Sequence, residues 1–158
     1  MNTIVIGIGN PLRGDDGAGL EIVQSWQEKC PRSANQVKIE YFDEPGLSLL
    51  NHLNGMKTVI LVDAFQSTEK TGTVMSFDAN DLSGFINDDR LSHGWGVIET
   101  LRLGRTLNLL PATCWIRVLG IVGENFELGA GYSQGVKTSI EKAIVQLEME
   151  VQNSLRII

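Results

Sequence analysis

The sequence has few of the features that mark disulfide-rich, membrane-spanning or secreted proteins. Its two cysteines, Cys30 and Cys114, lie far apart and form no CxxC pair, so we expect two free thiols in a reducing compartment rather than a disulfide. No apolar run approaches the ~20 residues of a membrane span. The N-terminal segment Met1-Asn2-Thr3 lacks the basic region of a signal peptide. We therefore expect a soluble, cytoplasmic protein.

Basic clusters and several catalytic signatures are also missing. The formal net charge is -6, which disfavours nucleic acids and acidic membrane surfaces as partners. The chain has no GxxxxGK[ST] P-loop and no HExxH zincin motif. We expect no Ser-His-Asp triad, and Cys114 falls in a predicted buried strand, which argues against a nucleophilic thiol.

Short apolar runs that alternate with amphipathic segments predict an α/β fold. Residues 4–8 and 57–63 have the continuous β-branched character of parallel strands buried on both faces. Further strands are expected at 37–42, 72–77 and 114–122, and a short connection favours an antiparallel orientation for 72–77. Helices are expected from about Asp16 to Pro31, from Gly46, over 96–109, and near the C-terminus, where apolar residues recur at spacings of 4, 3, 4 and 4: Ile140, Ile144, Leu147, Val151 and Leu155. This order predicts one domain over residues 1–158, with helices on both faces of a mostly parallel sheet.

The loop after the first strand invites comparison with nucleotide-binding loops. Gly7-x-Gly9 matches the start of the dinucleotide fingerprint, but Leu12 occupies the position of its third glycine. Asp15 and Asp16 stand where phosphates would bind, and like charges repel. A nucleotide site is therefore disfavoured. Two interpretations of the acids stay open: Asp15 caps the helix while Asp16 complements its dipole, or Asp16 is a functional carboxylate.

Three residues are candidates for a common site. Asp63 ends the buried strand, at the edge where doubly wound folds place their ligands. If the sheet order runs 2-1-3, the first and third strands lie about 4.8 Å apart, and Asp16 and Asp63 converge. His93, in the loop SHGWG, would complete a mixed oxygen and nitrogen set that suits nickel, zinc or another divalent first-row metal. Alternatively, Asp63 caps the next turn and His93 is a solvent-exposed loop residue. We expect His52, in the helical run LLNHLNG, to be a surface or boundary residue.

Three segments in this order, IGIGNPLRGDDGAG, VILVDAF and SHGWGVIETLRLG, resemble the hydrogenase maturation endopeptidase family. The resemblance extends over about residues 3–125. It implies a three-layer sandwich with a twisted, mostly parallel five-stranded sheet. It also implies one cut near the C-terminus of the large-subunit precursor of a nickel-iron hydrogenase, after nickel insertion. The metal-binding positions of the family fall on Asp16, Asp63 and His93, with nickel supplied by the precursor rather than firmly resident in the enzyme.

Several alternatives remain open after this resemblance. Many family members carry Glu where this chain has Asp16, which is one methylene shorter. Asp43 lies in a segment that matches the family only in part, and it is either close to the site or a turn acid beside Pro45. The metal could activate the water, or Asp16 could act as general base. Rival functions are a peptidase of the same fold with a resident metal, and a non-cleaving, chaperone-like module that binds the nickel-loaded precursor.

Overall fold

The computed structural model describes residues 1–80, 90 and 95–157. Its five strands form one sheet in the order β2-β1-β3-β5-β4. Four strands run parallel to one another, and only β4 is antiparallel to its neighbour β5. The 2-1-3 order, on which the convergence of Asp16 and Asp63 depended, is thus present. The antiparallel orientation favoured for the strand at 72–77 is confirmed. The strands are β1 (Thr3–Ile8), β2 (Lys38–Phe42), β3 (Thr58–Phe65), β4 (Val74–Asp78) and β5 (Trp115–Val122).

The two central strands β1 and β3 are buried along their whole lengths. Their residues are mostly β-branched or aliphatic, as strands covered on both faces require. In the register of this pair, Gly7 lies opposite Val62. The next residues along the two strands, Ile8 and Asp63, are therefore brought to the same edge of the sheet.

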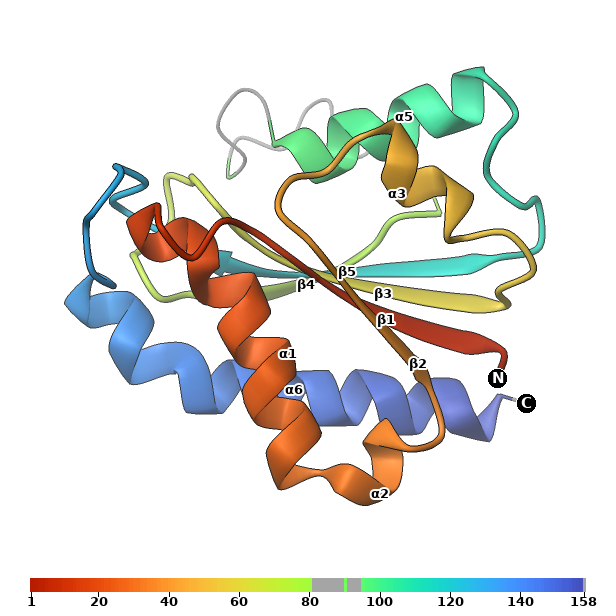
Figure 1. Ribbon diagram of the computed structural model, residues 1–158, viewed down its shortest axis with the longest axis horizontal. Coiled ribbons are helices and arrows are strands. Elements are labelled where there is room, and N and C mark those ends of the chain that lie inside the picture. The colour runs from red at the N-terminus through yellow and green to blue at the C-terminus, as the bar shows by residue number, and fades with distance from the viewer. Residues whose placement is uncertain (81–89, 91–94, 158) are drawn as a thin grey trace.

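Helices cover both faces of the sheet, which gives the predicted three layers (Figure 1). One face carries α1 (Ala18–Lys29) and α6 (Gln134–Arg156), and the other carries α3 (Leu47–Asn51) and α5 (Gly96–Thr106). Each face has its own apolar core. The predicted stripe of α6 faces the sheet, because Ile144, Leu147 and Val151 are buried in the same core as Trp26 of α1. No helix in the described part of the chain is long and apolar enough to cross a membrane.

Some element boundaries differ from the prediction. The helix expected from Asp16 begins as a 3-10 turn, η1 (Gly14–Gly17), and becomes α-helical at Ala18. Pro31 follows the end of α1 as predicted but also opens the short helix α2 (Pro31–Ala34), since proline tolerates the first helical position. The helix expected to reach residue 109 ends at Thr106, and Asn108 adopts a φ of 56°. Most of the segment between β4 and α5 lies outside the described residues.

Candidate active site

A cavity of about 250 Å³ lies at the carboxyl ends of β1 and β3. Its described lining comes from residues 8–9, 16, 43–45, 63–66, 95–96 and 126. All the charged side chains in that described lining are acidic: Asp16, Asp43, Glu44 and Asp63. A cleft lined by one sign of charge raises the local concentration of counter-ions, so this cavity favours cations.

Asp63 is the most deeply buried of these acids, with 5% of its surface exposed. The indole Nε1 of Trp95 donates a hydrogen bond of 3.0 Å to its Oδ2. Trp95 in turn stacks on Phe65, with ring centroids 4.2 Å apart. Burial raises the pKa of Asp63 to about 8; the indole and the Ala64 amide oppose that rise, and the charge of Asp16 adds to it. Asp63 is therefore a fixed carboxyl that ionises readily only when a cation compensates it.

Asp16 reaches the same cavity from the loop after β1 and is only partly buried. Its Oδ2 accepts a hydrogen bond of 2.8 Å from the backbone amide of Asn10. Burial raises the pKa of Asp16, although the Asn10 amide and the positive charge of Arg13 pull it down. The structure thus brings two candidate residues together, 47 positions apart in the sequence, and both carboxyls have raised pKa values.

Two glycines allow the loop to fold over the strand ends. Gly9 has a φ of 145°, and a Cβ there would lie 1.8 Å from the backbone oxygen of Asp16. A Cβ on Gly19 would lie 2.4 Å from the oxygen of Ile8 and 2.5 Å from that of Val62. Only glycine permits such contacts. These glycines therefore allow the loop and α1 to approach the sheet closely. This close approach sets Asp16 beside Asp63.

Comparison with known proteins adds to this geometry. A family model described as hydrogenase maturation protease matches residues 44–150. This chain belongs to the hydrogenase maturation protease family. The hydrogenase 2 maturation protease of Escherichia coli K12 is 24% identical over 155 residues, covering 98% of this chain and 93% of the relative. The [NiFe] hydrogenase maturation protease HybD from Thermococcus kodakarensis is 29% identical, with a TM-score of 0.70 and coverage of 96% of this chain and 99% of that chain. The maturating endopeptidase HybD from E. coli shares the fold, with a TM-score of 0.72 at 23% identity over 98% of this chain and 94% of that chain.

Membership of this family makes the protein a peptidase, and Cys114 is poorly suited to be its nucleophile. Both cysteines are free thiols, as expected. Cys114 is 2% exposed, and burial raises the pKa of its thiol to about 11. A thiolate, which is the nucleophilic form, is therefore disfavoured at neutral pH.

In this maturation protease Asp15 does not cap the helix that follows it, so the capping part of that interpretation was wrong. Neither η1 nor α1 has a side-chain hydrogen bond at its N-cap. The Asp15 carboxylate is fully buried and accepts hydrogen bonds from the backbone amides of Glu124, Asn125 and Ser133 and from the Ser133 hydroxyl. Burial alone would raise the pKa of Asp15, but these hydrogen bonds outweigh it and hold the pKa below its ordinary value.

Sequence reasoning missed Ser133, which lies in a run with GxSxG spacing, Gly131-Tyr132-Ser133-Gln134-Gly135. A nucleophile elbow places its serine on a sharp, strained turn between strand and helix. Here Ser133 directly precedes α6 with ordinary extended dihedral angles, φ −62° and ψ 156°. Its Oγ donates a 2.8 Å hydrogen bond to Asp15. Ser133 is therefore a support for the Asp15 carboxylate and lacks the geometry of a nucleophile elbow.

The other residues considered from the sequence are His93, Asp43 and His52. His93 lies outside the described residues, so its place in the site stays a prediction; Trp95, two positions later, lines the cavity. Asp43 lines the cavity and is exposed to solvent. His52 is half-buried at the end of α3, where its ring meets Phe42 edge-on at 5.0 Å. Within the described ranges, no group of three or more His, Cys, Asp or Glu side chains could hold a metal ion.

Proposed function

We propose that this protein is an endopeptidase that removes a short C-terminal peptide from the nickel-loaded precursor of a nickel-iron hydrogenase large subunit. One observation carries the proposal: Asp16 and Asp63 meet in a cavity whose described charges are all negative. Membership of the hydrogenase maturation protease family supplies the class of substrate. We further propose that the enzyme acts as one domain over residues 1–158 in the cytoplasm, where its free thiols would stay reduced.

The charge of the cavity explains why the precursor should carry a metal. With a pKa of about 8, the Asp63 carboxyl holds its proton at neutral pH unless positive charge is nearby. A divalent cation close to Asp63 and Asp16 would favour the ionised form of both. Oxygen and nitrogen ligands suit nickel, and we propose His93 as the third ligand. A nickel-free precursor would lack this attraction, so cleavage would depend on whether the precursor carries nickel.

The two carboxyls would have different tasks in this proposal. Asp63 is held in place by Trp95 and by its burial, so we assign it to gripping the substrate-borne nickel. Asp16 is more accessible and accepts one backbone hydrogen bond, so it can engage the nickel or take a proton from the attacking water as general base. Asp43 and Glu44, at the edge of the cavity, would contact the precursor around the cleaved bond.

The proposal is tested by incubating the purified, chelator-treated enzyme with nickel-loaded and nickel-free forms of the precursor. Mass spectrometry should detect loss of a short C-terminal peptide in the loaded sample alone. His93→Ala should weaken binding of the loaded precursor and leave binding of the nickel-free form unchanged. As a control, Glu99→Gln removes an exposed acid of α5 and should process normally.

The outcomes separate the parts of the proposal. Equal cleavage of both precursor forms would refute nickel recognition but not the peptidase activity. Absence of any cleavage, with the loaded precursor bound, would favour the non-cleaving module. A stoichiometric metal in the enzyme as purified would favour a peptidase with a resident metal.

A further inference from the structure

The consecutive acids Asp15 and Asp16 have different partners. The carboxylate of Asp16 lines the cavity and accepts one hydrogen bond, from Asn10 in its own loop. The carboxylate of Asp15 accepts four hydrogen bonds of 2.8–3.1 Å, all from the segment that follows β5. Asp16 therefore faces the site, whereas the carboxylate of Asp15 is hydrogen-bonded to a part of the chain that is distant in the sequence.

Asp15 is the centre of a wider connection between two loops. Its backbone amide also donates to the oxygen of Asn125 at 2.9 Å, and the amide of Gly129 donates to the oxygen of Leu12 at 2.8 Å. Together with the four bonds to the carboxylate, six hydrogen bonds join residues 12–15 to residues 124–133. Five of the six involve Asp15, so this residue dominates the connection.

Both loops contribute to the cavity. The first loop supplies Gly9 and Asp16, and the second supplies Phe126. Phe126 directly follows Asn125, which both donates to and accepts from Asp15. Any movement of the second loop away from the first would therefore shift Phe126 and Asp16 relative to each other.

We propose that Asp15 is a positioning residue for peptide cleavage: its buried carboxylate fixes the loop after β1 against the loop after β5 and so sets the place of Asp16 in the cavity. The proposal rests on the proposed function for the role of Asp16. Asp15 itself, fully buried and saturated with donors, does not touch the substrate. It acts through its neighbour in the chain.

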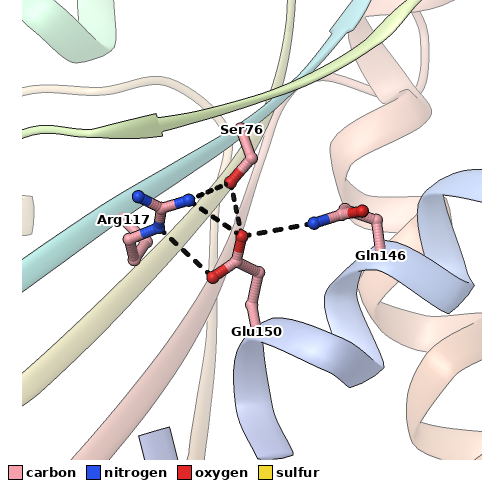
Figure 2. Close-up of polar contacts among 4 residues, drawn as sticks. All are labelled: Ser76, Arg117, Gln146 and Glu150. Atoms are coloured by element: carbon pink, nitrogen blue, oxygen red, sulfur yellow. Dashed lines mark hydrogen bonds and ion pairs between the residues drawn. The ribbon is translucent and has the colours of Figure 1, made fainter. Parts of the chain in front are cut away.

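The test needs a control that loses a comparable buried carboxylate away from the cavity. Glu150 of α6 provides it (Figure 2). Its side chain is nearly buried and accepts hydrogen bonds from Arg117, Ser76 and Gln146. Asp15→Asn and Glu150→Gln each remove one negative charge from a hydrogen-bonded carboxylate without changing its size. Both variants should lower the thermal unfolding temperature.

Activity should distinguish the two variants. At a temperature where both are fully folded, Asp15→Asn should lower kcat about 10- to 100-fold, since small misplacement of a reacting group has effects of that order. Its KM for the precursor should rise by a smaller factor than kcat falls, because Asp63 and the acids at the edge of the cavity keep their places. Glu150→Gln should keep the wild-type kcat. If Asp15→Asn is poorly folded, Ser133→Ala removes one of the four hydrogen bonds and should produce a smaller loss of kcat.

Amide hydrogen exchange gives a readout that needs no substrate. The Asn10 amide is bonded to Asp16, so its exchange reports where the Asp16 carboxylate lies. We expect faster exchange at Asn10 in Asp15→Asn, or to a lesser extent in Ser133→Ala, and no change in Glu150→Gln. Wild-type kcat and wild-type protection of Asn10 in the folded Asp15 variant would overturn the positioning role and leave the proposed function intact. If the wild-type enzyme cleaves no precursor, the proposed function fails, and Asn10 exchange alone decides whether Asp15 sets the place of Asp16.

Discussion

Replacing Asp63 by asparagine should make the protein more stable at alkaline pH while abolishing its activity. The introduced amide would have the shape of the native side chain, and its oxygen could still accept the hydrogen bond from Trp95. It cannot ionise, however, and the buried native carboxyl ionises only with difficulty. The change therefore removes the group proposed to grip the nickel and, at the same time, a source of instability in the free enzyme.

The magnitude follows from the pKa of Asp63, which burial raises from 3.8 to about 8. The folded form holds this proton more tightly than the unfolded form does. The stabilisation from that proton is complete below pH 4 and is lost as the pH rises to about 8. A shift of this size corresponds to a loss of stability on the order of 5 kcal/mol across this window, at up to about 1.4 kcal/mol for each pH unit. The asparagine variant has no such slope, because its amide does not titrate.

The assay is urea-induced unfolding of the wild type and Asp63→Asn at intervals from pH 4 to 9, with chelator present. The free energy of unfolding of the variant minus that of the wild type should increase by about 1.4 kcal/mol per pH unit. This difference should stop increasing above pH 8. Glu99→Gln, at an exposed acid of α5, is the control for loss of charge alone. Parallel curves for wild type and Asp63→Asn would refute the reasoning about burial. Normal processing of the precursor by the folded variant would remove Asp63 from the site.

Three further changes test neighbouring parts of the structure. Gly9→Ala places a methyl group 1.8 Å from the Asp16 backbone oxygen and should lower both the unfolding temperature and the processing rate; an unaltered unfolding temperature would contradict the close packing. Trp95→Phe removes a hydrogen bond that lowers the Asp63 pKa, so the pH-dependent loss of stability should end at a higher pH than in the wild type. Cys114→Ala should cost about 1 kcal/mol of stability and keep full processing, whereas an inactive, folded variant would favour the thiol as nucleophile.

Regular patterns made much of the fold predictable. Strands β1 and β3 are recognisable as continuous β-branched runs, and α6 as an apolar stripe with helical spacing. Asp63 could be predicted because it follows an apolar, buried run, and parallel strands bring their carboxyl ends to one edge of the sheet. The strand does not end at Asp63 as predicted, because β3 continues to Phe65. The sheet order then brings the loop that carries Asp16 to the same edge.

Contacts between segments that are distant in the sequence could not be predicted, because no regular pattern of residues marks them. Asp15 is bonded to residues 109 to 118 positions away, and the sequence holds no periodicity that links them. The same is true of Trp95, whose indole meets Asp63 across 32 positions. The SHGWG loop could be recognised as a candidate, but the direction of its tryptophan side chain depends on packing against Phe65. Such contacts depend on the folded arrangement of several elements.

The pair Asp15-Asp16 shows why residue type alone could not assign the roles. Two identical side chains stand next to each other, yet the pKa of one is lowered and that of the other is raised. The difference follows from the donors around them, because hydrogen bonds to an ionised carboxylate stabilise it: four reach Asp15 and one reaches Asp16. Asp15 is thus ionised at neutral pH, and hydrogen bonds occupy both of its carboxylate oxygens. Asp16 lines the cavity and accepts a single hydrogen bond, whereas its neighbour ties the loop to the rest of the protein.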